Sequence, residues 1–324
     1  MLDLSEVHVV SIPMRVPFRG VQHREAMLLR GPAGWGEFAP FLEYDDAESA
    51  RWLAAALEAT QVGWPAAVRE QVPVNATVPA VAAAEVAGVL ARFPGCTTAK
   101  VKVAQAGQAL RDDVERVAAV RDQLGLSGRV RVDANGAWSL SDARWAVAAL
   151  DAFGLEYVEQ PCASIEDLAL LRVALARAGI DMLVAADESV RKAQDPLLVA
   201  RAGAADVLVL KVAPLGGVRP ALAIAQECGL PVVVSSVLDT SVGIAAGAAL
   251  AAALPELPYA CGLATTSLMT GDVVRDSLDG HDGFVPVGAV AADAELLEQH
   301  AAPQERWNWW LARLARCAEL LPAD

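Results

Sequence analysis

Charged residues recur at nearly even intervals along the middle of this chain, each at the end of a short apolar segment. The segments TTAKVKV, RVRVDAN, LEYVEQP, MLVAADES and DVLVLKV carry these charges as Lys102, Asp133, Glu159, Asp187 and Lys211. A βα unit of a parallel barrel takes about the 24–31 residues that separate successive charges, and barrel enzymes keep their chemistry at the C-terminal strand ends. The spacing therefore predicts that the five charged groups converge on one point.

The alternation of apolar strands with helical segments extends over residues 72–264. We predict the strands at about 73–78, 98–103, 129–133, 155–159, 182–187, 206–211, 231–236 and 259–263. Several of them are continuous apolar runs, as in a parallel sheet that is covered by helices. No helical pattern follows the last strand. We therefore expect an α/β fold, a modified TIM barrel of the (β/α)7β type.

The two ends of the chain lack this rhythm. Residues 1–71 contain alternating strands, a hairpin turn at 31–34 and then a helix that starts near Asp45, which predicts a small α+β domain. Residues 265–324 include an amphipathic helix over the segment ERWNWWLARLARCAELL. The residues on its apolar side are Trp307, Trp310, Leu311 and Leu314. We expect this side to pack against the N-terminal domain.

The net charge of −14, from 26 basic and 40 acidic residues, limits the partners of the chain. Such a surface repels nucleic acid and anionic membranes, so we expect neither as a partner. A small-molecule carboxylate substrate then needs local positive charge, which the lysines supply. The sequence leaves the oligomeric state open, with a monomer among the options.

The cysteines and the apolar segments indicate a cytoplasmic protein. The five cysteines are scattered without CxxC spacing, which favours free thiols in a reducing compartment over disulfides. The N-terminus reads Met-Leu-Asp-Leu and lacks the basic region of a signal peptide. The longest apolar run, 242–254, is too short to span a bilayer, and we interpret it as a buried barrel helix.

The two lysines on the second predicted strand have the properties of a general base. Alternation along a strand puts Lys100 and Lys102 on the same face. Their mutual repulsion and their burial should lower the pKa values of both amines, which suits proton transfer near neutral pH. An isolated pair of this kind more often extends into solvent. The charged residues on the following strands favour a site instead.

Asp133, Glu159 and Asp187 end three consecutive predicted strands. Three carboxylates held close together repel one another unless a cation lies among them, and an all-oxygen ligand set selects Mg²⁺ or Mn²⁺ over zinc. Capping of the following helix is the alternative role for a single aspartate, and it is less favoured for three acids in succession. All four histidines lie outside the predicted barrel strands, which argues against a histidine-ligated metal.

Lys211 ends the sixth predicted strand and so should face Lys102 of the second strand across the barrel. A divalent metal that holds a carboxylate, with amines on both sides, stabilises the enediolate that forms when the proton α to that carboxylate is removed. The sequence therefore indicates chemistry of this kind.

Over residues 72 to about 264 this set of motifs resembles the barrel of the enolase superfamily. The matching segments are K-x-K at Lys100 and Lys102, V-D-A-N at Asp133, E-Q-P at Glu159, D-E-S at Asp187, and Lys211. The resemblance implies that the three carboxylates are metal ligands, that Lys102 and Lys211 are the acid/base lysines and that Lys100 helps to bind the substrate carboxylate. It also implies that residues 1–71 and 265–324 form a capping domain.

Within the superfamily the lysine pair resembles the muconate-cycloisomerase-like group, and the chain is most similar to the o-succinylbenzoate synthases in their short actinobacterial form. The supporting segments are R-V-D-A-N, S-S-V-L-D-T-S-V-G, F-R-G-V-Q-H-R-E and G-W-G-E-F-A-P-F. The candidates for substrate binding are Arg19, Arg131, Asn135, Ser235, Ser236 and Gly262. The implied reaction is the Mg²⁺-dependent syn-dehydration of a succinyl-hydroxycyclohexadiene carboxylate to o-succinylbenzoate in menaquinone biosynthesis. Lys102 would remove and return the proton, and Lys211 would be the cation on the opposite face.

Other members of this group resemble the chain in the same lysines, so the motifs leave alternatives open. An N-succinylamino acid racemase, which uses both lysines for proton transfer, is the main alternative, and a non-catalytic barrel is a minor one. Dipeptide epimerases hold a substrate ammonium with an acidic D-x-D after the eighth strand, whereas residues 261–265 here are Cys-Gly-Leu-Ala-Thr. Residues 15–24 are expected to form a mobile lid, from which Arg19, Gln22 and Arg24 either reach the succinyl carboxylate or remain exposed.

Overall fold

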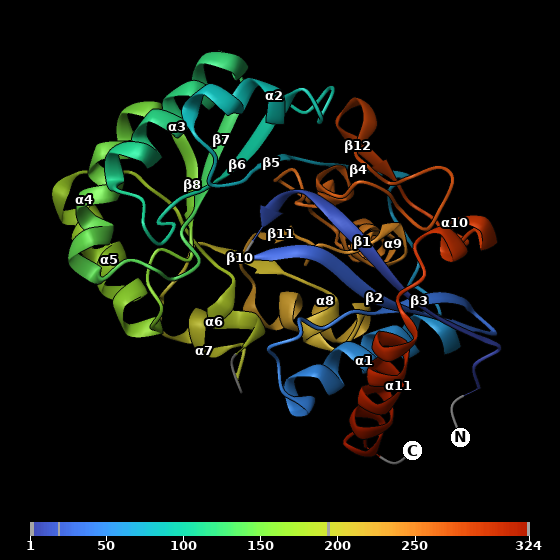
Figure 1. The fold of residues 1–324 in the computed structure, drawn as a ribbon. Helices are drawn as coiled ribbons and strands as arrows, with labels where there is room; N and C mark the ends of the chain where they lie inside the picture. The colour runs from blue at the N-terminus through green and yellow to red at the C-terminus, as the bar shows by residue number, and fades with distance from the viewer. Residues whose placement is uncertain (1–2, 19, 193–194, 323–324) are drawn as a thin grey trace.

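A curved parallel sheet of seven strands forms the centre of the molecule, and helices α2 to α5 line its outer side (Figure 1). The computed structural model describes residues 3–18, 20–192 and 195–322. Neighbouring strands follow the order β11-β10-β9-β8-β7-β6-β5, so strands that are consecutive along the chain are adjacent in the sheet. The bounds of these strands are β5 Ala76–Val78, β6 Thr98–Lys102, β7 Arg129–Asp133, β8 Leu155–Glu159, β9 Val184–Ala186, β10 Val207–Leu210 and β11 Val232–Val234.

Residues 260–262 close this sheet into a barrel. The amide of Asn75, just before β5, donates a hydrogen bond to the carbonyl of Cys261 at 2.9 Å, and the amide of Gly262 donates to Val234 of β11 at 2.8 Å. These contacts are single bridges rather than a continuous ladder. The eighth strand position is therefore occupied without a barrel helix after it. The α/β prediction of a modified TIM barrel, (β/α)7β, is confirmed.

The helices return the chain from the C-terminal end of one strand to the start of the next. Their bounds are α2 Val86–Leu90, α3 Leu110–Leu124, α4 Leu140–Leu150, α5 Ile165–Ala178, α6 Glu188–Arg191, α7 Leu198–Arg201, α8 Val218–Cys228 and α9 Ser241–Ala253. Ser139 and Ser164 cap α4 and α5, because each hydroxyl accepts from a backbone amide three residues later. In α9, a Cβ on Gly247 would lie 2.5 Å from Leu263, so the glycine permits close packing of this helix on the barrel.

The N-terminal domain begins with an antiparallel sheet in the order β1-β2-β3. Its elements are β1 Glu6–Phe18, β2 Val21–Gly31, β3 Gly34–Phe38 and α1 Asp46–Gln61. A turn at 32–33 joins β2 to β3, and Asp45 caps α1 by accepting from the amide of Glu48 at 2.8 Å. Most of the segment 15–24, expected to be a loop, belongs to the paired ends of β1 and β2. The predicted substrate-binding residue Arg19 lies outside the described residues.

The C-terminal segment returns to the N-terminal domain. After η4 (Thr265–Leu268) it forms β12 (Phe284–Pro286), which pairs with β4 (Gln71–Pro73), and then α10 (Ala294–Gln299) and α11 (Gln304–Glu319). Figure 1 shows α11 beside α1 at the edge of the molecule, and the two helices are in contact.

The apolar side of α11 packs on the N-terminal domain, with Trp310 at the contact. Trp310 is fully buried, and its ring meets Phe38 edge-on with centroids 5.7 Å apart. Its Nε1 donates to the carboxylate of Glu25 at 2.7 Å. Leu311 was expected on the same apolar side but is 37% exposed, because it follows Trp310 directly and points away from the interface.

The five cysteines are unpaired thiols, as predicted. Among the described residues, no helix combines the length and the apolar character that crossing a membrane requires. The apolar segment 242–254 corresponds to α9, which is buried between the barrel and the N-terminal domain.

Candidate active site

The structure brings the charged residues of the sequence pattern together at the C-terminal ends of the barrel strands. Strand register sets their level, since Lys102 is the Cα partner of Asp133, and Asp133 is the partner of Glu159. Asp187 directly follows β9, and Lys211 directly follows β10. The three carboxylates are fully buried, and Lys211 is 6% exposed.

Each carboxylate is paired with a lysine. Lys100 Nζ donates to both oxygens of Glu159 at 2.9 and 3.0 Å and lies 3.6 Å from Asp133 Oδ2. Lys102 Nζ donates to Asp133 and, at 2.8 Å, to Asn135 Oδ1. Across the barrel, Lys211 Nζ donates to Asp187 Oδ2 at 2.6 Å. Asp133 and Glu159 therefore share the ammonium of Lys100.

The two lysines of β6 titrate differently. Burial lowers the pKa of Lys102, and the neighbouring Lys100 ammonium adds to this effect against the pull of Asp133. Burial also disfavours the ammonium of Lys100, but Glu159 and Asp133 outweigh burial and raise the pKa of Lys100. The prediction that both pKa values are lowered is therefore wrong for Lys100, because this amine lies against two carboxylates.

The carboxylates also differ from one another. Burial and the charge of Asp133 raise the pKa of Glu159 to about 7. Burial favours the neutral form of Asp133 as well, but Lys102 and Lys100 outweigh burial and lower the pKa of Asp133. In the same way, Lys211 lowers the pKa of Asp187 against the effect of burial. The repulsion between Glu159 and Asp133 is the feature that a bound cation would relieve.

The donor set of the three acids suits a divalent cation. Within residues 3–18, 20–192 and 195–322, no three Asp, Glu, His or Cys side chains are grouped as a ready metal site, because the lysine amines lie against these acids. Asp133, Glu159 and Asp187 nevertheless supply only oxygen, end three adjacent strands and are completely shielded from solvent. Hard cations such as Mg²⁺ prefer such ligands. The residues therefore fit a divalent metal.

Two residues that sequence reasoning gave no role hold Asp187 in place. Arg191 Nε donates to Asp187 Oδ1 at 3.0 Å. Gln160, noted only as part of the E-Q-P segment, accepts from the amides of Asp187 at 2.9 Å and Ser189 at 3.2 Å through its Oε1. An arginine four residues after an acid in a helical turn was a signal that could have identified Arg191.

The side chains around the lysines enclose a small pocket of about 30 Å³. The predicted site residues that line it are Lys100, Lys102, Lys211, Asn135, Ser235 and Ser236. The lining residues that were not predicted are Phe18, Phe41, Thr77, Val237, Leu238 and Thr265. Among the residues that the structure describes, three amines and no carboxylate face this pocket. Phe18 and Phe41 belong to two of the segments that support the resemblance, F-R-G-V-Q-H-R-E and G-W-G-E-F-A-P-F, but these segments gave neither residue a role. Both come from the N-terminal domain and reach the site only through folding.

Two predicted substrate-binding residues lie behind the pocket lining. A Cβ on Gly262 would lie 2.5 Å from Ser235 Oγ, and the carbonyl of Gly262 accepts from Ser236 Oγ at 2.8 Å. Arg131 is fully buried one layer below Asp133, where its guanidinium donates to Glu156 at 2.5 Å and to the Ala260 carbonyl at 2.7 Å. These protein groups already bind the Arg131 guanidinium. A residue two positions before Asp133 on the strand lies on the same face as Asp133 but deeper in the barrel.

The backbone is strained around the site. Five non-glycine residues among those described have a positive φ. Three of them come one or two residues after the site residue that ends β6, β7 or β8, and these are Ala104, Asn135 and Gln160. Leu238, with φ of 63°, lines the pocket. Conformations of this kind persist only where the surrounding structure enforces them, and they concentrate at functional sites.

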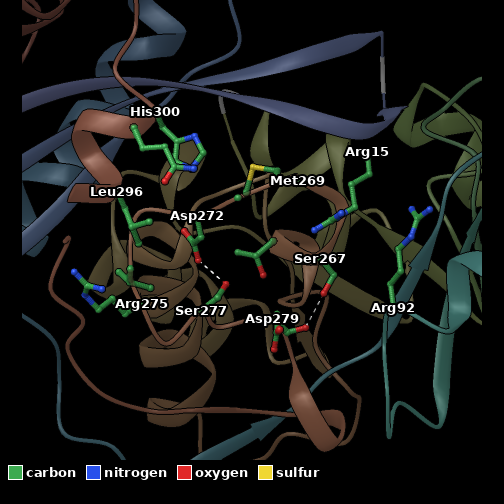
Figure 2. A pocket seen from close by; sticks show the side chains of 14 residues that line it. Arg15, Arg92, Ser267, Met269, Asp272, Arg275, Ser277, Asp279, Leu296 and His300 are labelled. Carbon is green, nitrogen blue, oxygen red and sulfur yellow. Dashed lines mark hydrogen bonds between the residues drawn. The ribbon is translucent and has the colours of Figure 1, made fainter. Parts of the chain in front are cut away.

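A larger cavity of about 710 Å³ lies elsewhere, between β1, α10 and the chain after the barrel. Figure 2 shows Arg15 and Arg92 at one side of it and Arg275 and His300 at the other. Arg275 and Asp272 are already hydrogen-bonded to neighbouring side chains. None of its described lining residues has a buried side-chain polar atom without a partner. This cavity shares no residue with the lysine-lined pocket, so size alone does not identify the site.

Two family models match the chain. Residues 9–60 match the model described as enolase N-terminal domain-like. Residues 80–291 match the model described as enolase C-terminal domain-like. The second match covers the barrel strands that carry the lysines and the acids.

Curated relatives are similar over nearly the whole chain. The o-succinylbenzoate synthase of Thermobifida fusca (strain YX) is 58% identical over 306 residues, which are 94% of this chain and 93% of the relative. The o-succinylbenzoate synthase of Mycolicibacterium smegmatis is 55% identical over 319 residues, 98% of this chain and 97% of the relative. The enzyme of the same name from Mycobacterium tuberculosis (strain H37Rv) is 54% identical, with coverage of 98% and 95%.

Solved structures share the fold at low sequence identity. The muconate lactonizing enzyme from Pseudomonas putida has a TM-score of 0.74 and 21% identity, covering 92% of this chain and 98% of that one. The L-Ala-D/L-Glu epimerase from Bacillus subtilis, in a substrate-liganded complex, has a TM-score of 0.75 and 22% identity, with coverage of 89% and 96%.

Proposed function

The chain belongs to the enolase superfamily and, within it, to the o-succinylbenzoate synthases, and we propose that its lysine-lined pocket carries out their reaction with the residues assigned below. The enzyme is a hydro-lyase. Its substrate is a succinyl-hydroxycyclohexadiene carboxylate, from which the proton α to the carboxylate and a hydroxyl group leave as water. The product, o-succinylbenzoate, is aromatic.

The composition of the pocket lining is the observation that carries the residue assignment. Lys100, Lys102 and Lys211 face the pocket, and none of its described lining residues is a carboxylate. The substrate carries two carboxylates, and the whole chain carries a net charge of −14. A concentration of amines is therefore what an anionic substrate needs for binding here. The absence of a lining acid also disfavours a substrate with a free ammonium.

Lys102 is the proton carrier in this proposal. Its lowered pKa increases the fraction of neutral amine, which can accept the α-proton at Nζ. The electrons of the broken C–H bond pass into the ring, and the Lys102 ammonium returns the proton to the departing hydroxyl on the same face. The C–O bond breaks, water leaves, and the new double bond completes the aromatic ring. One residue therefore suffices for a syn elimination.

Lys211 and Lys100 supply charge. Lys211 lies on the opposite strand, where its ammonium, paired with Asp187 at 2.6 Å, faces the other side of the ring and stabilises negative charge that develops there. Lys100, whose pKa is raised by Glu159 and Asp133, stays protonated and binds the ring carboxylate. Asn135 keeps Lys102 in position through its 2.8 Å hydrogen bond.

A divalent metal completes the site, and we propose Mg²⁺, with Mn²⁺ as the alternative ion. Asp133, Glu159 and Asp187 would hold it. When bound, the metal draws negative charge onto the substrate carboxylate and so acidifies the α-proton. We also propose the division of the chain into residues 1–71, 72–264 and 265–324, the first and last of which form the cap that contributes Phe18 and Phe41 to the pocket.

Racemisation of N-succinylamino acids is the second candidate activity. The observation that favours it is the placement of Lys102 and Lys211 on opposite sides of one pocket, which two-base chemistry requires. Such a substrate also lacks a free ammonium, in agreement with the lining.

The test is to incubate the purified protein with Mg²⁺ and the cyclohexadiene substrate and follow the loss of diene absorbance. We expect o-succinylbenzoate to form, no product with EDTA, and no product with Lys102→Met. The same protein is then given single enantiomers of N-succinylamino acids. Racemisation without dehydration would assign the second activity. If the protein catalysed neither reaction, the barrel would be non-catalytic.

A further inference from the structure

Arg24 of β2 lies beneath the lining of the lysine pocket, without being part of it. Its side chain is 3% exposed. Arg24 Nε donates to the carbonyl of Leu238 at 2.9 Å, and Nη2 donates to the carbonyl of Ala39. One residue of the N-terminal domain thus holds the loop after β11, residues 235–240, against the end of β3.

The contacts of Arg24 reach both apolar walls of the pocket. Its guanidinium lies 4.8 Å from the ring centroid of Phe41, which lines the pocket from the N-terminal domain. Leu238, whose carbonyl it binds, lines the pocket from the barrel. Leu238 has a positive φ of 63°, a conformation that a residue with a Cβ adopts only under constraint. The hydrogen bond from Arg24 is such a constraint.

Two buried acidic side chains lie beside Arg24. Glu37 and Asp239 both act on its guanidinium electrostatically. They lie close together, since a Cβ on Gly243 would be 2.7 Å from the Cβ of Asp239 and 3.2 Å from Cδ of Glu37. Glu37 accepts from the amides of Thr240 at 3.1 Å and Gly243 at 3.2 Å, at the start of α9. The same cluster therefore holds the loop that carries Ser235, Ser236 and Leu238 at its middle, through Leu238, and at its C-terminal end, through Thr240.

We propose that Arg24 is a positioning residue that sets the shape of the substrate pocket by holding Leu238 and Phe41 against each other across the boundary between the two domains. The proposal rests on the proposed function only in that the pocket is where the substrate binds. The pocket is closed to about 30 Å³, so the cap must open for entry and then re-form the same walls around the ring. When the cap closes again, the contacts of Arg24 with the Leu238 carbonyl and the Phe41 ring restore the positions of these two walls. A misplacement of about 1 Å in such a wall costs up to about 100-fold in rate.

Arg24→Met and Arg24→Lys test this role. Methionine removes both carbonyl contacts and the charge, whereas lysine keeps the charge beside Glu37 and Asp239 but reaches only one of the two carbonyls. Arg69→Met is the matched control. Arg69 also donates to backbone carbonyls of another segment, Leu254 at 2.7 Å and Pro255 at 3.1 Å, but touches no residue of the pocket.

Three measurements are made on each variant. Hydrogen–deuterium exchange at residues 235–240 reports on the loop whether or not the protein is active. Steady-state kinetics with the cyclohexadiene substrate give KM and kcat, and titration with Mn²⁺ gives metal affinity. For Arg24→Met we expect exchange at 235–240 to accelerate at least about tenfold, and kcat/KM to fall by about 10–100-fold with unchanged Mn²⁺ affinity. In exchange and in kcat/KM, Arg24→Lys should lie between wild type and Arg24→Met. Arg69→Met should match wild type in all three measurements.

The outcomes separate this proposal from the function itself. Unchanged exchange at 235–240 in Arg24→Lys and Arg24→Met, or wild-type kcat/KM in an active enzyme, would overturn it. A loss of activity that Arg69→Met reproduces would show a general effect on stability and would also overturn it. Should Arg24→Met fail to fold, Arg24→Lys alone decides by the same criteria. Should the wild-type protein not dehydrate the substrate, the proposed function fails while the exchange measurement still decides the role of Arg24.

Discussion

Replacing Lys211 by arginine separates the two roles that an amine can have at this position. Arginine stays protonated near neutral pH, so it keeps a positive charge but cannot carry a proton. Lys211 pairs with Asp187 at 2.6 Å, and a guanidinium can retain that pair. A dehydration that uses only Lys102 as base should therefore survive in Lys211→Arg. Racemisation, which needs a base on each face, should be lost.

The size of each effect follows from the burial of the site. Lys211 is 6% exposed, and a charge facing the reacting group in such a site is typically worth about 10²–10³ in kcat. Lys211→Met should thus lower dehydration by about that factor. It should also destabilise the fold by about 3–5 kcal/mol, because it removes one partner of a buried ion pair and leaves Asp187 with Arg191 alone. Lys211→Arg keeps the charge, but it is larger and the pocket measures about 30 Å³, so we expect a loss of about tenfold.

Dehydration is followed by diene absorbance, and racemisation by α-proton exchange of an N-succinylamino acid in D₂O. We expect racemisation by Lys211→Arg to fall by about 10²–10⁴, the range for loss of a general base. Lys102→Met should lose both reactions. Urea unfolding of each variant identifies any loss that comes from the fold. The ratio of the two activities is decisive: if Lys211→Arg kept racemisation and lost dehydration, the roles assigned to the two lysines would be wrong.

Three further predictions concern the metal, the pH dependence of stability and the C-terminal helix. Loss of a residue that only supports a metal ligand typically weakens metal binding by about 10–100-fold. Asp187→Asn should weaken Mn²⁺ binding, measured by calorimetry, by more than this; unchanged affinity would remove Asp187 from the ligand set. Burial and Asp239 raise the pKa of Glu37 from 4.5 to about 8, so between these pH values the native state binds more protons than the unfolded chain and the free energy of unfolding falls as pH rises. Glu37→Gln should flatten that fall in urea unfolding at pH 5 and pH 8, and an unchanged slope would contradict the assignment. Trp310→Ala should lower the free energy of unfolding by about 3–5 kcal/mol and Trp310→Phe by about 1–3 kcal/mol; equal urea midpoints for Trp310→Ala and wild type would show that α11 adds nothing to stability.

The sequence by itself determined the barrel and the positions of its charged residues. Strand alternation and helix caps are local signals, so α1 begins directly after Asp45, near which the sequence predicted a helix start. Because parallel strands end at the same edge, the spacing from Lys102 to Lys211 was enough to predict that their side chains meet. The alternation of Lys100 and Lys102 on one face was likewise readable from two residues.

Only the tertiary structure decided how these groups are surrounded. The raised pKa of Lys100 depends on Glu159, which is 59 residues away in the chain. The depth of Arg131 below the site depends on the Ala260 carbonyl that closes the barrel beneath it.

The pocket walls are decided in the same way. They depend on Phe18 and Phe41, which belong to another domain, and on Arg24, which binds a carbonyl 214 residues further along the chain. The physical reason is that burial and electrostatic interactions act through space. A local pattern specifies which residues face the site, whereas their environment arises only when distant segments pack together.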